Sequence, residues 1–127
     1  MKKYFVETTN FTNWVAELPP EWDRDFAALQ NRLMNDPEIG KVMKGCGGLR
    51  KVRLADSKRK KGKRGGIRVI YLHVPEVDCI CMIHAYGKDE KDDLSSEERQ
   101  VFAEYAERAK QKVLRASGRA ETAEDEK

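Results

Sequence analysis

The chain has 127 residues, a mass of 14.6 kDa and a net charge of +3, which suits one domain with a modest core and excludes a multidomain enzyme. Charged residues make up 37 % and the mean hydropathy is -0.77. No segment approaches the roughly 18 consecutive apolar residues of a spanning helix, so a membrane protein is excluded. Glu7 also interrupts any apolar leader, and we expect a cytoplasmic protein.

The first third of the chain predicts a short strand and two amphipathic helices. Residues 4–6 have strand character, and Asn10 is a candidate cap for a helix whose apolar side chains recur on one face up to Leu18. The prolines at 19–20 end that helix. A second helix is predicted over residues 22–35, where large apolar side chains recur every three or four residues.

The rest of the chain predicts an antiparallel meander and a final helix. Strands are expected over residues 49–55, 67–74 and 79–86. Ser95 and Glu98 have the spacing of a capping box and begin a helix with an apolar stripe. The fold class is therefore α+β: an N-terminal strand and two helices, an antiparallel β-sheet meander, and a C-terminal helix.

The domain is predicted to span residues 1–116. Residues 117–127 carry four acidic and no large apolar side chains, so they are predicted to form a disordered acidic tail.

Positive charge is concentrated in the middle of the sequence. Residues 41–71 contain twelve Lys or Arg and a single acid, Asp56, a net charge of +11, whereas the remainder carries -8. An acidic body with one intensely basic region favours a polyanionic partner. A solvated charge run without a ligand is the alternative.

Some of these cations lie on predicted strands. Alternation along a strand puts Lys51 and Arg53 on one face, with Val52 on the other. Arg68 lies inside an otherwise apolar run, with no acid nearby in the sequence. A charged side chain in such surroundings usually has an anionic partner.

The cysteines and histidines give no pattern of a metal site. Cys46, Cys79 and Cys81 are an odd number without zinc-ligand spacing, which favours buried reduced thiols over disulfides or metal. His73 and His84 lie on predicted strands, where packed or hydrogen-bonded histidines are more common than catalytic ones. We expect no metal site.

Three segments together resemble a known family. They are Gly48–Arg53, Gly62–Tyr71 and Tyr86–Leu94, and their order and spacing resemble the RelE/HigB toxins of type II toxin-antitoxin systems, with the basic loop most similar to the HigB branch. The resemblance covers residues 4 to 112 and implies a RelE/ParE-like fold.

The resemblance implies a ribosome-dependent endoribonuclease that cuts mRNA in the ribosomal A site without metal or cofactor. The 2'-hydroxyl of the RNA attacks the adjacent phosphate, and basic side chains stabilise the charge that develops. Lys51 and Arg53 match the paired cations of the family's central strand, Arg68 matches its phosphate-binding arginine, and Lys88 occupies the Gly-Lys position after the last strand. The implied partners are mRNA, ribosomal RNA and a cognate antitoxin of the HigA-like helix-turn-helix kind.

The chain departs from RelE at two positions of that pattern. Asp89 and Ser95 stand where RelE has an arginine and a tyrosine, which leaves the general acid open. Tyr86 and Lys88 are the candidate substitutes. Alternatively, Tyr86 completes the strand and Lys88 is a surface turn residue.

The basic loop is predicted to bind ribosomal RNA. Flexible cations gain affinity by displacing counterions rather than by reading bases. The predicted contacts are Lys58, Arg59, Lys60, Lys61, Lys63 and Arg64.

Two other functions fit the same sequence. The related ParE toxins share the fold and inhibit DNA gyrase, and a non-catalytic nucleic-acid-binding protein would use the same cations as anchors. DNA breaks after induction would indicate the first alternative, and the absence of both DNA and mRNA cleavage the second.

Overall fold

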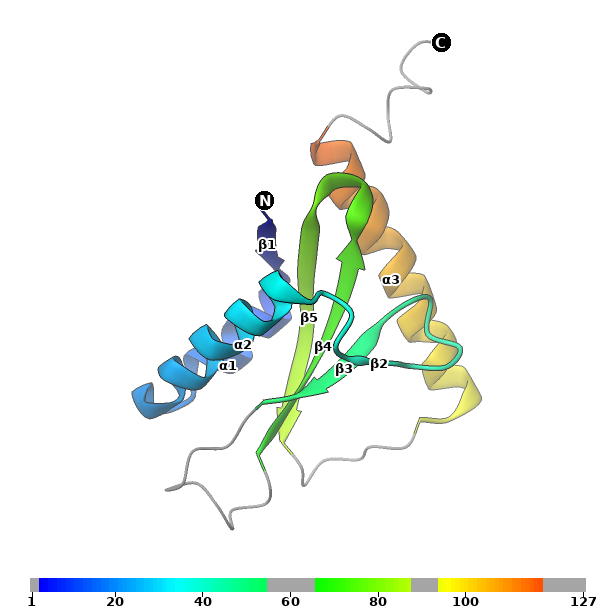
Figure 1. Ribbon diagram of the computed structural model, residues 1–127. Helices are drawn as coiled ribbons and strands as arrows, with labels where there is room; N and C mark the ends of the chain where they lie inside the picture. The colour runs from blue at the N-terminus through cyan, green and yellow to red at the C-terminus, as the bar shows by residue number, and fades with distance from the viewer. Residues whose placement is uncertain (1–2, 55–65, 88–93, 118–127) are drawn as a thin grey trace.

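The computed structural model describes residues 3–54, 66–87 and 94–117 (Figure 1). The elements in chain order are β1 (Tyr4–Glu7), α1 (Thr9–Ala16), a 3-10 turn (Pro20–Trp22), α2 (Asp23–Asn35), β2 (Lys41–Val42), β3 (Arg50–Arg53), β4 (Ile67–Val74), a 3-10 turn (Pro75–Val77), β5 (Cys79–Gly87) and α3 (Ser96–Ala116). This is the predicted α+β class.

One five-stranded sheet organises the domain, in the order β1-β5-β4-β3-β2. The predicted meander is confirmed, because β3, β4 and β5 pair antiparallel with their sequence neighbours. β1 joins the edge beside β5 in parallel, and β2 forms the other edge against β3. Neither edge pairing was predicted.

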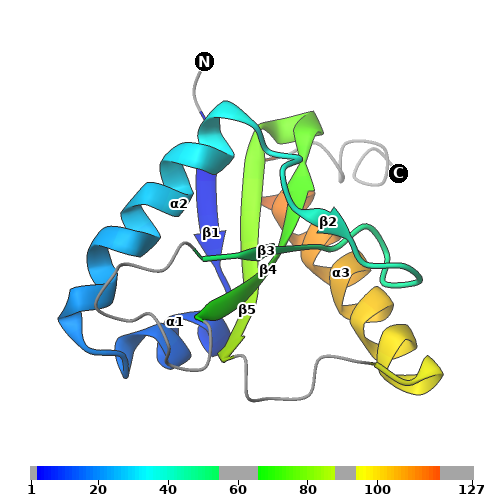
Figure 2. The same cartoon turned by 60° about the horizontal axis from the view of Figure 1, so that its bottom comes forward.

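The sheet lies between two helical layers, with α1 and α2 on one face and α3 on the other (Figure 2). Val69, Tyr71 and Ile80 pack in the core beneath α1 and α2. Ile70 and Ile83 pack in the core beneath α3. Alternating side chains of β4 therefore supply both cores, which explains its nearly continuous apolar sequence.

The helix starts follow from local hydrogen bonds. The predicted capping box is observed: Glu98 N donates to Ser95 Oγ (3.1 Å), and Ser95 N donates to Glu98 Oε1 (2.8 Å). The predicted cap at Asn10 is wrong. Thr8 is the N-cap, because its Oγ1 accepts a hydrogen bond from Phe11 N at 3.0 Å, and Asn10 lies inside the first turn.

The connection between β2 and β3 packs against α3. Gly47 has a φ of +72°, and a Cβ there would lie 3.0 Å from the carbonyl oxygen of Ala103 on that helix. Arg99 donates from Nη1 to the carbonyl of Lys44 at 2.6 Å. Glycine is needed here both for its positive φ and for the close approach of the two backbones.

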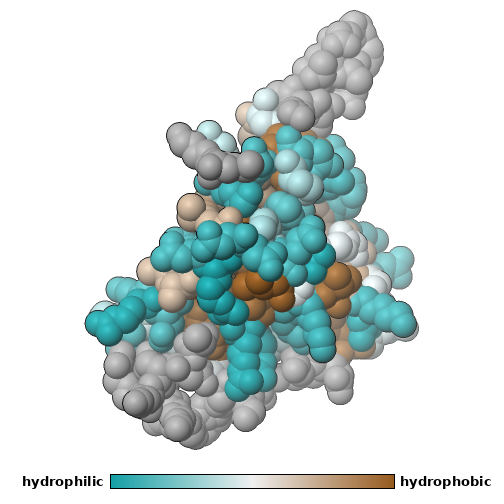
Figure 3. All heavy atoms as spheres, viewed as in Figure 1, coloured by the Kyte–Doolittle hydropathy of each residue, from teal (hydrophilic) through white to brown (hydrophobic). Residues whose placement is uncertain are grey.

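The described surface is consistent with the charged composition. Hydrophilic side chains cover most of the face seen in Figure 3, and hydrophobic residues show only in small patches between them. Within the described ranges, no helix is both long and apolar enough to cross a bilayer.

Candidate active site

Two arginines and a tyrosine form one row across three strands. Arg53 on β3 lies opposite Arg68 on β4, and Arg68 lies opposite Tyr86 on β5. Residues opposite one another on neighbouring antiparallel strands have Cα atoms about 5 Å apart, so the row extends over roughly 10 Å. The Arg53 side chain is exposed, that of Arg68 is half-buried, and Tyr86 is buried. The sheet therefore holds two arginines opposite each other on neighbouring strands.

A second row lies one step along the same face. Lys51 lies opposite Ile70, which lies opposite His84. Lys51 and Arg53 thus share a face, as predicted, and Val52 packs in the core on the other side. We call Lys51, Arg53, Arg68, His84 and Tyr86 the cationic face. Rigid strands supply every one of its members.

The other predicted site residues lie outside the described residues. They are Lys88, Lys58, Arg59, Lys60, Lys61, Lys63 and Arg64. Their contribution to RNA binding stays a prediction.

No family model matches the chain. Solved structures do resemble it. A free E. coli RelE toxin with two arginines replaced by alanine aligns at a TM-score of 0.57 and 17% identity, over 83% of this chain and 97% of that one. The isolated E. coli RelE toxin gives 0.54 and 16%, over 85% and 99%. The E. coli RelBE toxin-antitoxin complex gives 0.55 and 17%, over 71% and 100%.

The chain has the fold of the RelE toxins. At these identities the comparison establishes the three-dimensional arrangement, and the chemistry has to be argued from the side chains.

The opposite face of the RelE-like sheet also carries an arginine, a tyrosine and a histidine. Arg50 donates from Nη1 to the carbonyl of Gly40 at 2.8 Å. The Tyr71 hydroxyl donates to the carbonyl of Pro37 at 2.7 Å and accepts from Gly40 N at 2.9 Å. His73 Nδ1 lies 3.9 Å from a Glu38 carboxylate oxygen. These contacts hold residues 37–40, which follow α2, against β3 and β4.

Burial sets the protonation of this second cluster. It raises the pKa of Tyr71, so the phenol stays neutral and can donate its hydrogen bond. Burial also lowers the pKa of His73, an effect that the nearby Glu38 carboxylate partly opposes. Both groups are therefore uncharged near neutral pH and act structurally.

The cysteines of the RelE-like domain are free and buried, as predicted. Burial raises the pKa of Cys79, and raises that of Cys81 to about 11, so the thiols rather than the reactive thiolates are present at neutral pH. Among the residues that the structure describes, no three His, Cys, Asp or Glu side chains are grouped to hold a metal ion.

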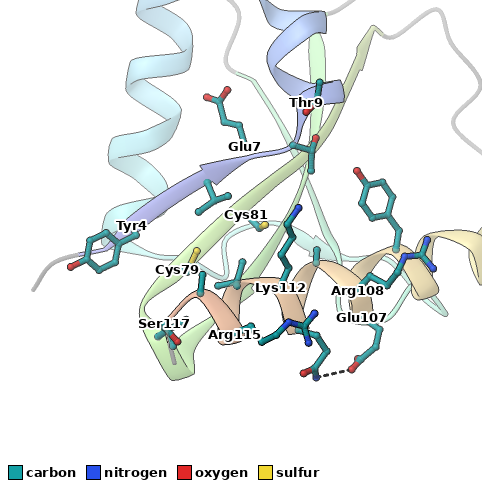
Figure 4. A pocket seen from close by; sticks show the side chains of 18 of the residues that line it. Tyr4, Glu7, Thr9, Cys79, Cys81, Glu107, Arg108, Lys112, Arg115 and Ser117 are labelled. Carbon is teal, nitrogen blue, oxygen red and sulfur yellow. Dashed lines mark hydrogen bonds between the residues drawn. The ribbon is translucent and has the colours of Figure 1, made fainter. Parts of the chain in front are cut away.

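A groove lies between β1, β5 and α3, and at one end it reaches Asn10, whose side chain contacts His84. Figure 4 shows Cys79 and Cys81 of β5 on its floor, Tyr4 of β1 at one side and Lys112 of α3 at the other. Its lining combines apolar side chains with the cations Arg108, Lys112 and Arg115 and with the carboxylates of Glu7 and Glu107, which oppose the binding of an anion. Phosphate chemistry therefore fits the cationic face better than the groove.

Sequence reasoning gave His84 no place in the site. Its Nδ1 lies 3.0 Å from Nδ2 of Asn10, and its ring stacks on Tyr86 with centroids 5.9 Å apart and an interplanar angle of 21°. Alternation along the strand from Tyr86 was the available signal for His84. No sequence signal indicates Asn10, because its contact joins residues 74 positions apart.

Proposed function

We propose that this chain is the toxin of a type II toxin-antitoxin system and a metal-independent endoribonuclease that cuts mRNA in the A site of the ribosome. The observation that carries the proposal is the row of Arg53, Arg68 and Tyr86 across the sheet. The fold similarity to RelE toxins and the +11 charge of residues 41–71 support it.

The proposed reaction uses the substrate's own nucleophile. The 2'-hydroxyl attacks the adjacent phosphorus, the bond to the 5'-oxygen breaks, and a 2',3'-cyclic phosphate and a 5'-hydroxyl result. The protein has to align these atoms and stabilise the negative charge on the phosphate oxygens. A preorganised donor of this kind typically contributes about 3 to 4 kcal/mol to lowering the barrier.

Arg68 is the best placed phosphate ligand. It is central in its row, and a guanidinium can hold two phosphate oxygens at once. Arg53 adds a second charge beside it. Together the two side chains can bind a phosphate whose charge increases as the reaction proceeds.

Proton transfer is the less constrained part of the mechanism. Lys51 can act as a base only when its amine is neutral. The candidate acids for the leaving oxygen are the Tyr86 hydroxyl and Lys88, which lies outside the described residues. We assign Lys51 mainly to charge stabilisation, because it lies on the face that carries Arg53 and Arg68.

The partners follow from the same proposal. The RelBE structure contains a toxin bound to its antitoxin, and we propose a cognate antitoxin for this chain too. The HigB-like basic loop favours a HigA-like helix-turn-helix antitoxin. The loop itself would bind ribosomal RNA.

Replacement of Arg68 by alanine tests the function. We expect Arg68→Ala to abolish growth arrest and reduce mRNA cleavage on programmed ribosomes by at least about 100-fold, because the central phosphate ligand is lost. Primer extension measures the cuts, and thermal unfolding verifies the fold. Arg24→Ala, at an exposed position on α2, removes the same charge and should leave cleavage unchanged.

Three results would contradict the proposal: intact mRNA with wild-type protein, DNA breaks in place of mRNA cuts, or full toxicity of Arg68→Ala. The second would indicate a ParE-like gyrase inhibitor.

A further inference from the structure

A β-bulge in β5 sets the direction of His84. The pairing of β4 with β5 runs regularly up to Tyr71 opposite Met82, and then Ile70 lies opposite His84, so Ile83 is the extra residue. Bulges change where the following side chains point, and they are frequent beside active sites. Here the bulge lets Ile83 pack in the core beneath α3 while His84 lies on the cationic face.

The junction of β1 and α1 holds the bulged backbone in place. Thr8 N donates to the carbonyl of Met82 at 3.0 Å, and Thr8 Oγ1 donates to the carbonyl of Ile83 at 2.8 Å. The same Oγ1 caps α1 by accepting from Phe11 N. One threonine thus fixes the helix start and the bulge relative to each other.

Two contacts then orient the imidazole of His84. The Asn10 amide lies against Nδ1, and the ring is stacked on Tyr86. With Asn10 donating through Nδ2, Nδ1 accepts and the ring proton is on Nε2.

We propose that His84, as a neutral imidazole, donates a hydrogen bond from Nε2 to the phosphate at which the RNA is cut. The inference rests on the proposed function and adds a substrate-contacting residue to it. A neutral imidazole can stabilise negative charge on an oxygen through a directed hydrogen bond without releasing its proton. In this role the neighbouring cations balance the negative charge of the phosphate, and the hydrogen bond from His84 orients it. Asn10 is a positioning residue, since it sets which ring nitrogen carries the proton.

Two substitutions at His84 separate the hydrogen bond from packing and from proton transfer. Phenylalanine keeps a planar ring to stack on Tyr86 and has no donor. Glutamine lacks the ring and cannot transfer a proton near neutral pH, but its side-chain amide places a donor near the position of Nε2. The assay is single-turnover cleavage of mRNA on programmed ribosomes, with thermal unfolding to verify each fold. His73→Phe is the matched control, because His73 lies on the opposite face.

We expect His84→Phe to slow cleavage about 100- to 1000-fold and His84→Gln to stay within about tenfold of wild type. The control should cleave at the wild-type rate. Cleavage by His84→Phe within about threefold of wild type would overturn the inference, whereas the loss of activity in Arg68→Ala would still support the function. Equal loss in both His84 variants would also overturn it, because it would indicate proton transfer by His84. No cleavage by the wild type would overturn function and inference together.

Discussion

The two faces of the central strands carry the same three kinds of polar side chain and use them differently. Beneath α2, Arg50, Tyr71 and His73 contact backbone carbonyls, a backbone N–H and the carboxylate of Glu38. On the cationic face, the residues directly opposite Arg68 are another arginine and a tyrosine. The first cluster consists of hydrogen bonds and an ion pair between the sheet and residues 37–40, whereas the second brings two arginines opposite each other.

This difference agrees with the proposal that the cationic face binds an anion and that the other cluster is structural. Like charges opposite each other on a sheet destabilise the fold, while a satisfied buried hydrogen bond stabilises it. A sheet that retains adjacent arginines has a local arrangement that a bound anion would stabilise. Substitutions in the cationic face should therefore change activity, and substitutions in the other cluster should change stability.

Charge reversal at Arg53 should give the largest difference between the effect on activity and the effect on stability. Arg53→Glu puts a carboxylate opposite Arg68, so we expect cleavage to fall at least about 1000-fold because the phosphate meets a negative charge. The free energy of unfolding should rise by about 0.5 kcal/mol through the new cross-strand pair. Ribosome cleavage and urea unfolding measure the two effects. If Arg53→Glu is less stable and still active, the cationic face contributes to stability and not to cleavage.

Removal of the Tyr71 hydroxyl should lower the stability of the protein and leave its cleavage activity unchanged. Tyr71→Phe leaves the carbonyl of Pro37 and the N–H of Gly40 without their bonds, at a cost of about 1 to 3 kcal/mol. The rate of cleavage by folded protein should not change. Tyr4→Phe, at a tyrosine that is 59% exposed on β1, is the control and should alter stability by less than about 0.5 kcal/mol. Loss of cleavage in folded Tyr71→Phe would show that the two faces do not act independently.

The pH dependence of stability should give the smallest effect. Burial lowers the pKa of His73 below 6.5, so the unfolded chain takes up a proton at a higher pH than the folded protein does. The free energy of unfolding should therefore fall as the pH drops below about 6.5, and His73→Phe should weaken this decline. Urea unfolding at pH values on both sides of that point measures it. An unchanged slope in His73→Phe would mean that other groups cause the decline.

Local patterns predicted much of the fold. The capping box at Ser95 and the meander of β3 to β5 depend on residues close in sequence, and both are observed. The α1 cap was predicted at Asn10, but Thr8 is the cap, because its side chain accepts the hydrogen bond from Phe11 N. The N-terminal strand was predicted but its pairing was not, because β1 joins the sheet beside β5, 75 residues later in the chain. β2, which is two residues long, was not predicted.

The sequence by itself determined which cations share a face, because strand periodicity requires Lys51 and Arg53 to point the same way. It also determined that positive charge is concentrated around these strands. Only the tertiary structure decided that Arg53, Arg68 and Tyr86 form one row, and that a bulge adds His84 with Asn10 beside it. The register between strands and the contacts of a distant helix depend on how both cores pack, and no local pattern of residues encodes that packing.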